Sequence, residues 1–405
     1  MEKVIKGFGK IPSDWDIVKL REISSLITKG ATPTTYGFEW QESGIPFFKS
    51  DCIKDGRFVY GAFKYIDSKA HEQMNRSKTQ RGDLLISITG DVGKVAVVPK
   101  NIEEANINQH IAKIRINKSG VENNFVYHWL NQSKIRSYYN VIKTGLAYPQ
   151  ISLEQVRDTE IPLPNIHEQS KITSILSTWD KAIDLKEKLI GQKKEKKKEL
   201  MQKLLTGKVR INGYKEEWKE VTLGSVFKER KDIGYENLEL LAITSQKGVV
   251  KRSEVNIKDT SSEDKSKYKR ICPNDIGYNT MRMWQGVSGV SKYEGIVSPA
   301  YTILIPTKNI NSQFMGYLFK LPTVINLFKR FSQGLVDDTL NLKYENFKII
   351  KVKIPGSLQE QEMIAEILNT LDEELSILNY EKELIHNQKQ GLIQNLLTGK
   401  IRVKV

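Results

Sequence analysis

The sequence is poor in cysteine and has no long apolar run. Its only cysteines are Cys52 and Cys272, and neither has a second Cys or a His at the spacing of a metal site. A disulfide framework and a structural metal site are therefore not expected, and both thiols are interpreted as ordinary, partly buried side chains. No stretch approaches the roughly 18 to 20 apolar residues of a membrane-spanning helix, and the first ten residues lack the apolar core of a signal peptide. We expect a soluble, cytoplasmic protein with no membrane partner.

Sequence signatures of catalysis are also missing. The segment from Gly90 to Val95 is the nearest approach to a phosphate-binding loop, but its spacing is wrong and no Ser or Thr follows Lys94, so a turn is predicted. No G-x-G-x-x-G follows a predicted strand, which leaves a dinucleotide or methyl-donor pocket unsupported. The five histidines are scattered singly. The sequence therefore predicts no catalytic and no metal-binding residues, although carboxylates that converge only in the folded chain leave a hidden active site open.

Positive charge is abundant and unevenly distributed. Among 405 residues, 63 Lys and Arg face 48 Asp and Glu, for a net charge of +15. Such an excess favours a polyanionic partner. Residues 1–167 carry +5 and 209–359 carry +8, whereas 168–208 and 360–400 carry +5 and −5. The excess therefore lies mainly on the two regions that precede these last two segments.

An internal repeat organises the chain. Residues 168–208 align without a gap on 360–400, and 15 of the 41 pairs are identical. Asn165 and Ser357 stand three residues before Glu168 and Glu360, as in a capping box. Gly207 and Gly399 occupy the place of a left-handed residue after a helix. Each copy is thus predicted to be a helix of roughly 40 residues, about 60 Å long.

The two predicted helices carry apolar seams at heptad spacing, which favours pairing along their length. Lys186 and Lys193 interrupt the first seam. The residues expected to mediate helix pairing and partner docking are Ile172, Leu176, Trp179, Ile183, Leu200, Leu204, Ile364, Leu371, Leu378, Ile385 and Leu392.

Charge predicts the direction and register of the pair. In an antiparallel arrangement in which position 168+k meets 399−k, the Lys-rich run 193–198 lies opposite the acidic residues 372–374. Two alternatives stay open, because the run is also compatible with a solvated face or with direct contact to DNA.

The regions 1–164 and 209–356 are predicted to be mixed globular domains of short strands, turns and a few helices. Several of their loops combine basic residues with aromatic, amide or hydroxyl side chains, which can contact phosphates and base edges. Any one of these loops is also compatible with ordinary surface. The candidate DNA-binding residues are Lys29, Thr32, Thr34, Thr35, Tyr36, Lys49, Lys94, Lys143, Thr144, Tyr148, Gln150, Thr244, Gln246, Lys247, Asn279, Arg282, Trp284, Gln285, Arg330 and Gln333.

The double arrangement resembles the specificity subunit of a type I restriction-modification system over essentially the whole chain. The residues that carry the resemblance are Ile11, Pro12, Trp15, Ile161, Pro162, Glu168, Gln169, 204–208, Trp218, Ile354, Pro355, Glu360, Gln361 and 396–400. The resemblance implies an α+β or mixed α/β fold, with target-recognition domains at 1–164 and 209–356. Two long antiparallel coiled-coil helices, 165–208 and 357–405, would join them in a pseudo-twofold repeat.

The same resemblance implies a subunit without catalysis of its own. Each domain would read one half of a split site in double-stranded DNA, and the helices would set the gap and dock two modification (methyltransferase) subunits. Restriction subunits would join the full complex. S-adenosylmethionine, ATP and Mg would bind the partner subunits, and no cofactor would bind this chain. An orphan or truncated DNA-binding scaffold is the main alternative. A self-contained nuclease or methyltransferase is the third.

Overall fold

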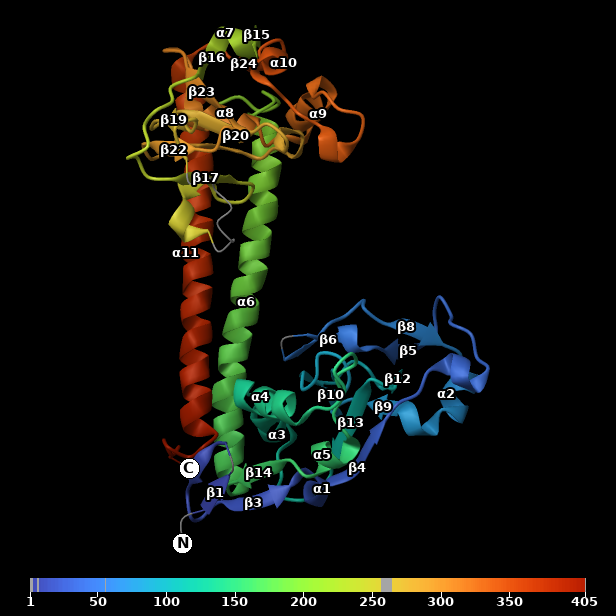
Figure 1. The fold of residues 1–405 in the computed structure, drawn as a ribbon. Helices are drawn as coiled ribbons and strands as arrows, with labels where there is room; N and C mark the ends of the chain where they lie inside the picture. Colours follow the sequence, from blue (N-terminus) through green and yellow to red (C-terminus); the bar gives the residue numbers. More distant parts are fainter. Residues whose placement is uncertain (1–2, 6, 55, 256–263, 405) are drawn as a thin grey trace. The chain divides into compact units, whose positions relative to one another are not determined.

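The computed structural model describes residues 3–5, 7–54, 56–255 and 264–404 (Figure 1). The chain forms two compact units. Unit 1 comprises Met1–Lys186 and Glu381–Val405, and unit 2 comprises Glu187–Tyr380. Each unit contains one mixed region of strands and short helices together with a segment of both long helices.

The long helices are α6, Ile166–Leu204, and α11, Leu358–Leu396. Both stop a few residues before the end of the repeated segment, where the chain turns. Gly207 and Gly399 have φ of 68° and 69°, which confirms the prediction of left-handed residues after both helices.

The predicted capping boxes form only partially. Asn165 Oδ1 accepts the N–H of Glu168 at 3.0 Å, and Ser357 Oγ accepts that of Glu360 at 3.4 Å. The carboxylates of Glu168 and Glu360 accept hydrogen bonds from Arg and Trp side chains instead of the capping backbone. The prediction of a reciprocal box is therefore wrong in its second half, because these carboxylates have stronger, charged donors available.

Within each unit the helices run antiparallel in the expected register. In unit 1 Lys186 Nζ lies 2.9 Å from Glu381 Oε2, and in unit 2 Lys193 Nζ lies 2.5 Å from Glu374 Oε1. Both pairs satisfy the rule that 168+k meets 399−k. The two lysines that interrupt the seam thus face carboxylates of the other helix.

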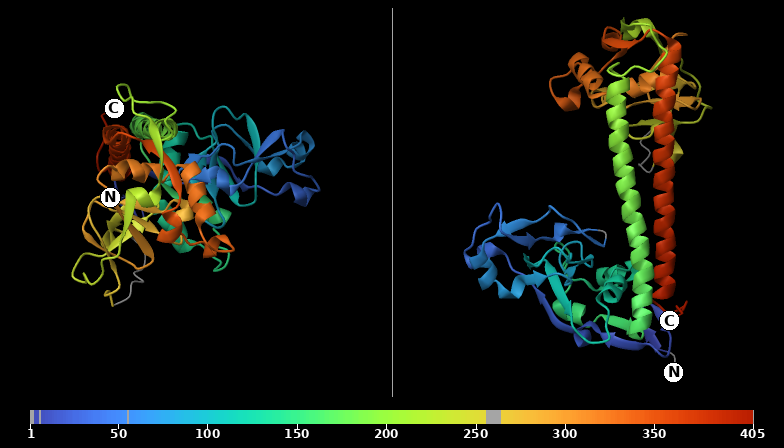
Figure 2. Two further views of the ribbon diagram at one scale, coloured as in Figure 1. Left: turned by 90° about the horizontal axis from the view of Figure 1, so that it is seen from above. Right: turned by 180° about the vertical axis from the view of Figure 1, so that it is seen from behind.

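Only some lysines of the Lys-rich run take part in this pairing. Lys197 lies 2.5 Å from Asp372, whereas Lys194, Lys196 and Lys198 are exposed. Part of the run thus pairs with the other helix, and the rest is exposed on the surface of α6. The segment of the helix pair in unit 1 can be followed along its length in the right-hand view of Figure 2.

The predicted seam residues are buried or half-buried. In unit 1 Ile172 and Leu176 pack in one core with Ile393 and Leu396. In unit 2 Leu204 packs with Ile364 and Leu368, and Leu200 and Leu371 flank that core. Trp179 and Ile385 are half-buried; Ile183, Leu378 and Leu392 complete the seam and are at most partly exposed.

Unit 1 is built around two four-stranded sheets, in the orders β11-β10-β13-β4 and β8-β5-β12-β9. The first is antiparallel, and the second contains one parallel pair, β5 with β12. Its strands are β1 (Lys3–Ile5), β2 (Gly9–Ile11), β3 (Asp16–Lys19), β4 (Ser24–Lys29), β5 (Ile45–Phe48), β6 (Ile53–Lys54), β7 (Arg57–Phe58), β8 (Lys64–Ile66), β9 (Lys78–Gln80), β10 (Leu84–Ser87), β11 (Val95–Val97), β12 (Glu104–Ile107), β13 (Ile111–Ile116) and β14 (Glu160–Leu163). Its short helices are α1 (Leu20–Ile23), α2 (Ser68–Gln73), α3 (Asn123–Leu130), α4 (Ser133–Ile142) and α5 (Leu153–Arg157).

Unit 2 repeats the first sheet in the order β16-β23-β20-β21. Its strands are β15 (Trp218–Thr222), β16 (Phe227–Arg230), β17 (Leu241–Thr244), β18 (Gly248–Lys251), β19 (Lys269–Ile271), β20 (Ile276–Asn279), β21 (Ser288–Val290), β22 (Gly295–Val297), β23 (Tyr301–Pro306) and β24 (Lys351–Pro355). Its short helices are α7 (Leu223–Val226), α8 (Ser312–Leu318), α9 (Pro322–Phe331) and α10 (Tyr344–Phe347). The mixed α and β composition of both regions agrees with the sequence-based expectation.

Candidate nucleic-acid interface

The repeated signature residues of unit 1 form an ion pair, with a buried carboxylate, between the start of α6 and the chain beyond α11. Glu168, only 1% exposed, accepts hydrogen bonds from Arg402 Nε at 2.6 Å and from Trp15 Nε1 at 3.2 Å. Arg402 also binds Asp14 at 2.8 Å, and these bonds raise the pKa of the guanidinium, that to Glu168 most. A Cβ on Gly399 would lie 2.3 Å from the Pro12 ring, so only glycine fits there. We call this arrangement the latch of unit 1.

Unit 2 contains the same latch, made by the corresponding residues. Arg210 Nε donates to Glu360 Oε1 at 2.7 Å, and Arg210 Nη2 donates to Oε2 at 2.8 Å. Trp218 Nε1 lies 3.4 Å from the same carboxylate, whose side chain is wholly buried. The latch joins the beginning of α11 to the chain after α6, as the latch of unit 1 does with the two helices exchanged.

The glutamines that follow the latch carboxylates hold each globular region against its helix. Gln169 Nε2 donates to Pro164 O and Gly120 O, and its Oε1 accepts the N–H of Glu122 at 2.8 Å. Gln361 makes the corresponding bonds in unit 2, to Pro355 O, Asn309 O and Asn311 N. The acidic and amide residues of the repeated signature therefore position the globular regions.

Several candidate residues of unit 1 lie together around the loop 143–150. Thr144 and Gln150 exchange backbone hydrogen bonds, and Gly90 N donates to Pro149 O, which joins this loop to the turn that carries Lys94. Lys94 pairs with Asp91 at 2.8 Å. Lys143, Thr144, Tyr148 and Gln150 are exposed.

The other candidates of unit 1 lie on a neighbouring segment. Thr34, Thr35 and Tyr36 belong to a 3-10 turn, Pro33–Tyr36, and are exposed, as is Lys29. Thr32 Oγ1 donates to Gln109 Oε1 at 2.6 Å. Gln109 lies 3.0 Å from His110, whose ring contacts that of Tyr148 at a centroid distance of 6.0 Å.

The sequence interpretation missed Gln109 and His110, which connect the segment of Thr32 to the loop 143–150. It also missed Trp40, over which the half-buried Lys49 lies, with 5.6 Å between Nζ and the ring centre. No local pattern in the sequence marks Gln109 and His110, because their partners Thr32 and Tyr148 lie far away along the chain.

In unit 2 most candidates gather where β20 ends. Asn279 Oδ1 accepts the N–H of Met281 at 3.0 Å, and Trp284 Nε1 donates to Met281 O at 3.1 Å. Helix α9 packs against the short turn Met283–Gln285 and brings Lys329 Nζ to 5.1 Å from the Trp284 ring centre. The exposed side chains of Arg282, Gln285, Arg330 and Gln333 complete this group. Lys329 was not predicted, although its neighbour Arg330 was.

The remaining candidates of unit 2 lie elsewhere. Thr244, Gln246 and Lys247 form the turn between β17 and β18, where Thr244 Oγ1 accepts the N–H of Lys247 at 3.0 Å. Gln246 and Lys247 line a cavity of 580 Å³ that is also lined by Lys197 of α6 and Asp372 of α11. This turn therefore faces the helix pair of its own unit, and the structure does not bring it to the group around Asn279.

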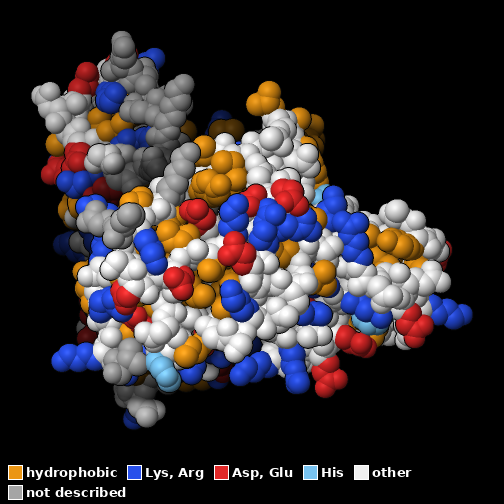
Figure 3. All heavy atoms as spheres, turned by 90° about the horizontal axis from the view of Figure 1, so that it is seen from below, with side chains coloured by type: hydrophobic (Ala, Val, Ile, Leu, Met, Phe, Trp, Pro, Cys, Tyr) orange, Lys and Arg blue, Asp and Glu red, His pale blue; other side chains and the backbone are white. Residues whose placement is uncertain are grey.

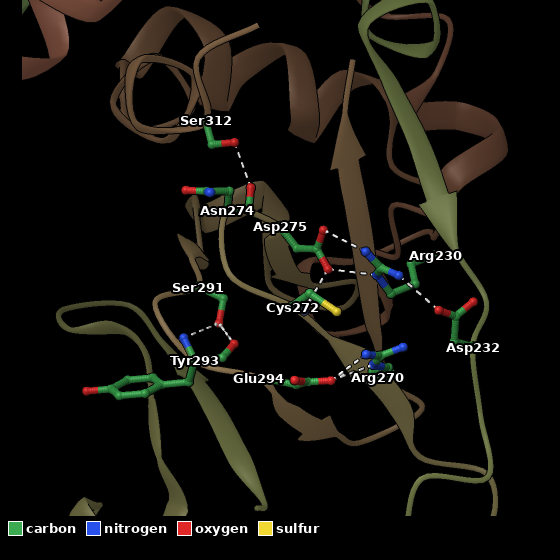
Figure 4. Close-up of polar contacts among 10 residues, drawn as sticks. All are labelled: Arg230, Asp232, Arg270, Cys272, Asn274, Asp275, Ser291, Tyr293, Glu294 and Ser312. Atoms are coloured by element: carbon green, nitrogen blue, oxygen red, sulfur yellow. Dashed lines mark hydrogen bonds and ion pairs between the residues drawn. The ribbon is translucent and has the colours of Figure 1, made fainter. Parts of the chain in front are cut away.

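A buried ion pair orients the strand that leads to each group. In unit 2 Asp275, 2% exposed, accepts two hydrogen bonds from Arg230 of β16 and one from Cys272 N, as Figure 4 shows. These bonds raise the pKa of Arg230, the bond to Asp275 most. In unit 1 Asp83 precedes β10 in the same way and binds Arg115 of β13 through two bonds of 2.7 Å. Each ion pair thus fixes the residue that precedes an inner strand of its sheet, β10 in unit 1 or β20 in unit 2.

Lys320 holds the segment that follows Trp284 in unit 2. Lys320 Nζ donates to Gly286 O at 2.6 Å and to Ser288 O at 2.8 Å. Burial lowers the pKa of Lys320 to about 8. Because both acceptors are backbone oxygens of the segment after Trp284, this side chain sets the path of that segment.

Basic side chains are mixed with other kinds of side chain on one face of the molecule. On the face drawn in Figure 3, Lys and Arg side chains are interspersed with Asp and Glu side chains and with apolar ones.

Metal-ligand groups, membrane-spanning helices and the two cysteines can be compared with the sequence-based expectations. Among the described residues no group of three or more His, Cys, Asp and Glu side chains is placed to hold a metal ion. None of the described helices is long and apolar enough to cross a bilayer. Cys52 is buried and Cys272 half-buried, both as free thiols, and burial raises the pKa of Cys52 to about 11.

Comparisons with known proteins agree with this architecture. A family model described as type I restriction modification DNA specificity domain matches residues 12–193 and again 215–387. A provisionally named MjaX specificity subunit of a type I restriction enzyme from Methanocaldococcus jannaschii is 24% identical over 423 aligned residues, 98% of this chain and 96% of that protein. The EcoBI specificity subunit of Escherichia coli is 25% identical over 166 residues, 40% of this chain and 34% of that protein. The crystal structure of a type I restriction-modification S subunit from M. genitalium superimposes with a TM-score of 0.58 at 15% identity and covers 95% of this chain and 96% of its own.

Proposed function

Because this chain belongs to the type I restriction modification DNA specificity family, whose domain it contains twice, we propose that it is the DNA-reading subunit of a type I restriction-modification complex. Each unit reads one half of a split site in double-stranded DNA. The observation that carries this proposal is that three features occur in both units. These are the same four-stranded antiparallel sheet, a buried Asp–Arg pair beside it, and a group of cationic, amide and aromatic side chains near the end of β10 or β20.

The two groups of side chains fit DNA recognition by their chemistry. Lys143 and Arg330 are exposed cations that can contact phosphates, while Gln150, Gln285 and Arg282 present the amide and guanidinium groups that bind base edges in the major groove. Trp284 is fixed by its hydrogen bond to Met281 O and so offers a rigid aromatic surface. The loop 244–247 is a weaker candidate, because it faces the helix pair.

The partners of the subunit are proposed to be two modification (methyltransferase) subunits, one for each unit, with restriction subunits joining the full complex. In unit 2 Ile377 and Tyr380 of α11 are 59% and 71% exposed, and in unit 1 Leu185 of α6 is 66% exposed. Large apolar side chains exposed on a helix suit a protein partner. In this proposal S-adenosylmethionine, ATP and Mg bind the partner subunits, the chain itself performs no catalytic step, and the complex works in the cytoplasm.

The helices are proposed to set the unread gap between the two half-sites. Each is continuous over 39 residues, and an α-helix lengthens by about 1.5 Å per residue. Inserting one heptad into both helices, within 182–196 of α6 and at the facing positions of α11, preserves the seam and the register. We expect the gap to change by whole base pairs while both half-sites keep their sequence.

The experiment is methylome sequencing of a host that expresses the chain with its methyltransferase, with and without the insertion. A split motif whose two halves are retained and whose gap differs supports the proposal. Changed bases inside a half-site would contradict the role of the helices in setting the gap. A host without any split methylated motif, despite a stable complex, would contradict the proposed function itself.

A further inference from the structure

In both units a protruding loop carries a leucine whose side chain is wholly exposed. The relative exposure is 106% for Leu146 in unit 1 and 101% for Leu335 in unit 2. Each follows a glycine, Gly145 or Gly334, and the two Gly-Leu pairs occupy corresponding places after helices α4 and α9. A single exposed apolar side chain is common. Here the exposed leucine occurs at the same position in both copies of the repeat, so it belongs to the repeated structure.

The loop of unit 1 is held firmly at its base. Thr144 N donates to Gln150 O at 2.9 Å, and Gln150 N donates to Thr144 O at 2.8 Å. The next residue, the buried Ile151, donates its N–H to Ile88 O at 3.0 Å, at the end of β10. The tip that carries Leu146 is therefore attached to the sheet through both of its ends.

The loop of unit 2 is constructed in the same way. Gln333 and Asn341 exchange backbone hydrogen bonds of 2.9 and 2.8 Å, and the buried Leu342 donates to Thr280 O at 2.8 Å, just beyond β20. The residues between the two anchored ends differ from those in the loop of unit 1. The anchoring hydrogen bonds and the exposed leucine are the same.

The glycines give both tips their shape. Gly145 and Gly334 have φ of 84° and 140°, and a Cβ at either would lie within 2.6 Å of a backbone oxygen, that of Tyr148 or Thr339. Only glycine adopts this conformation without strain. The backbone thus turns outward just before each leucine.

Charged groups around the tips favour a nucleic-acid partner over a protein. In unit 1 the exposed Lys143 begins the loop. In unit 2 Lys329 lies 3.0 Å from Asp337 and Arg282 lies 3.9 Å from Asp338, so cations neutralise both acidic residues that follow the tip. An apolar tip that is flanked by cations and carries no uncompensated acidic group fits side chains that enter a DNA groove and separate a pair of stacked bases.

We propose that Leu146 and Leu335 are paired apolar wedges, each of which enters the DNA of its own half-site and unstacks one base step. The inference rests on the proposed function and deepens it. A methyltransferase that modifies a base must take that base out of the stack. A wedge supplied by the DNA-reading subunit lowers the cost of this step in the half-site that it contacts.

The test uses the full chain in complex with its methyltransferase and a duplex that contains the methylated site. The fluorescent base 2-aminopurine replaces one base at a time in each half-site, and its emission rises when it is unstacked. We expect Leu146→Ala to abolish the rise in one half-site and Leu335→Ala to abolish it in the other. Methylation of the affected half-site should slow about tenfold. Leu146→Met and Leu335→Met should retain the signal, because an apolar wedge of similar volume remains.

Matched controls are Val4→Ala in unit 1 and Ile349→Ala in unit 2, which shorten exposed apolar side chains outside the loops. Both should leave fluorescence and methylation unchanged. An undiminished signal in both leucine-to-alanine variants would overturn the wedge, as would loss of the methyltransferase from those variants on gel filtration, because the tips would then dock a protein. A wild-type complex that modifies no specific site would refute the proposed function, and the wedge with it.

Discussion

Replacing Arg210 by Ala should destabilise unit 2 far more than the loss of an ordinary surface ion pair would. Arg210 binds the carboxylate of Glu360 through two hydrogen bonds, of 2.7 and 2.8 Å. The side chain of Glu360 is 0% exposed and that of Arg210 32%. Removing the guanidinium leaves a buried carboxylate with Trp218 Nε1 as its remaining side-chain donor, at 3.4 Å.

The expected cost follows from this burial. Removing one partner of a buried ion pair costs about 3–5 kcal/mol, because an uncompensated charge stays in the interior. Replacing both partners by apolar residues, Arg210→Met with Glu360→Leu, removes that charge and should recover most of the loss. The matched control is Arg21→Ala, whose ion pair with Asp158 is 43% and 44% exposed and should contribute about 0–1 kcal/mol.

The measurement is hydrogen exchange of the full chain followed by mass spectrometry, which reports opening free energies for peptides of each unit separately. Peptides of unit 2 should lose protection in Arg210→Ala while those of unit 1 keep it. Arg402→Ala, which disrupts the latch of unit 1, should give the reverse pattern. If Arg210→Ala and Arg21→Ala cost the same, or if the double substitution is no more stable than Arg210→Ala, the reasoning from burial is refuted.

Three further predictions concern the helix pair, a buried histidine and the end of α11. Glu374→Lys should lower the free energy of unfolding by about 0.2–1 kcal/mol at low salt, as measured by urea unfolding, and adding Lys193→Glu should restore it. If Glu374→Lys leaves the free energy of unfolding at low salt unchanged, the charge pairing is contradicted. Burial lowers the pKa of His128 from 6.5 to about 4, so the unfolded chain takes up this proton first and stability falls between pH 7 and 5 by about 2 kcal/mol. His128→Leu should remove the contribution of this histidine to the loss of stability. If the urea midpoint of the variant depends on pH as that of the wild type does, the assignment to His128 is contradicted. Gly399→Ala should destabilise the chain by about 1–3 kcal/mol, because Gly399 has a positive φ and an added Cβ would meet the Pro12 ring. Gly391→Ala inside α11, where an added Cβ would have nothing within 4 Å, should stabilise the chain by about 0.5–1 kcal/mol. Similar melting temperatures for the two variants would contradict both predictions.

The long helices were accessible from the sequence because their signals are local. Heptad spacing, a capping residue and a terminal glycine lie within one segment, and the duplication supplied a second copy of each signal. Even the register of the pair followed from opposite charges on the two segments, as Lys193 and Glu374 show. Strand and helix positions in the globular regions followed in outline for the same reason.

The roles of the signature residues were not accessible in this way. The sequence suggested that Glu168 caps its own helix, whereas the folded chain pairs it with Arg402, which lies 234 residues away. Trp15 and Gly399, from opposite ends of the chain, likewise meet in one contact. Such pairs leave no periodic trace, because each depends on the packing of elements that are distant in sequence.

The amino-acid sequence alone thus specified the duplicated plan, the two helices and the basic character of the two domains, since these depend on composition and on spacing along the chain. Tertiary structure decided which loops act together. It brought Lys329 to Trp284, near the end of β20, and turned the loop 244–247 toward the helices. It also exposed Leu146 and Leu335 at two anchored tips, because the burial of a side chain depends on the complete set of contacts around it.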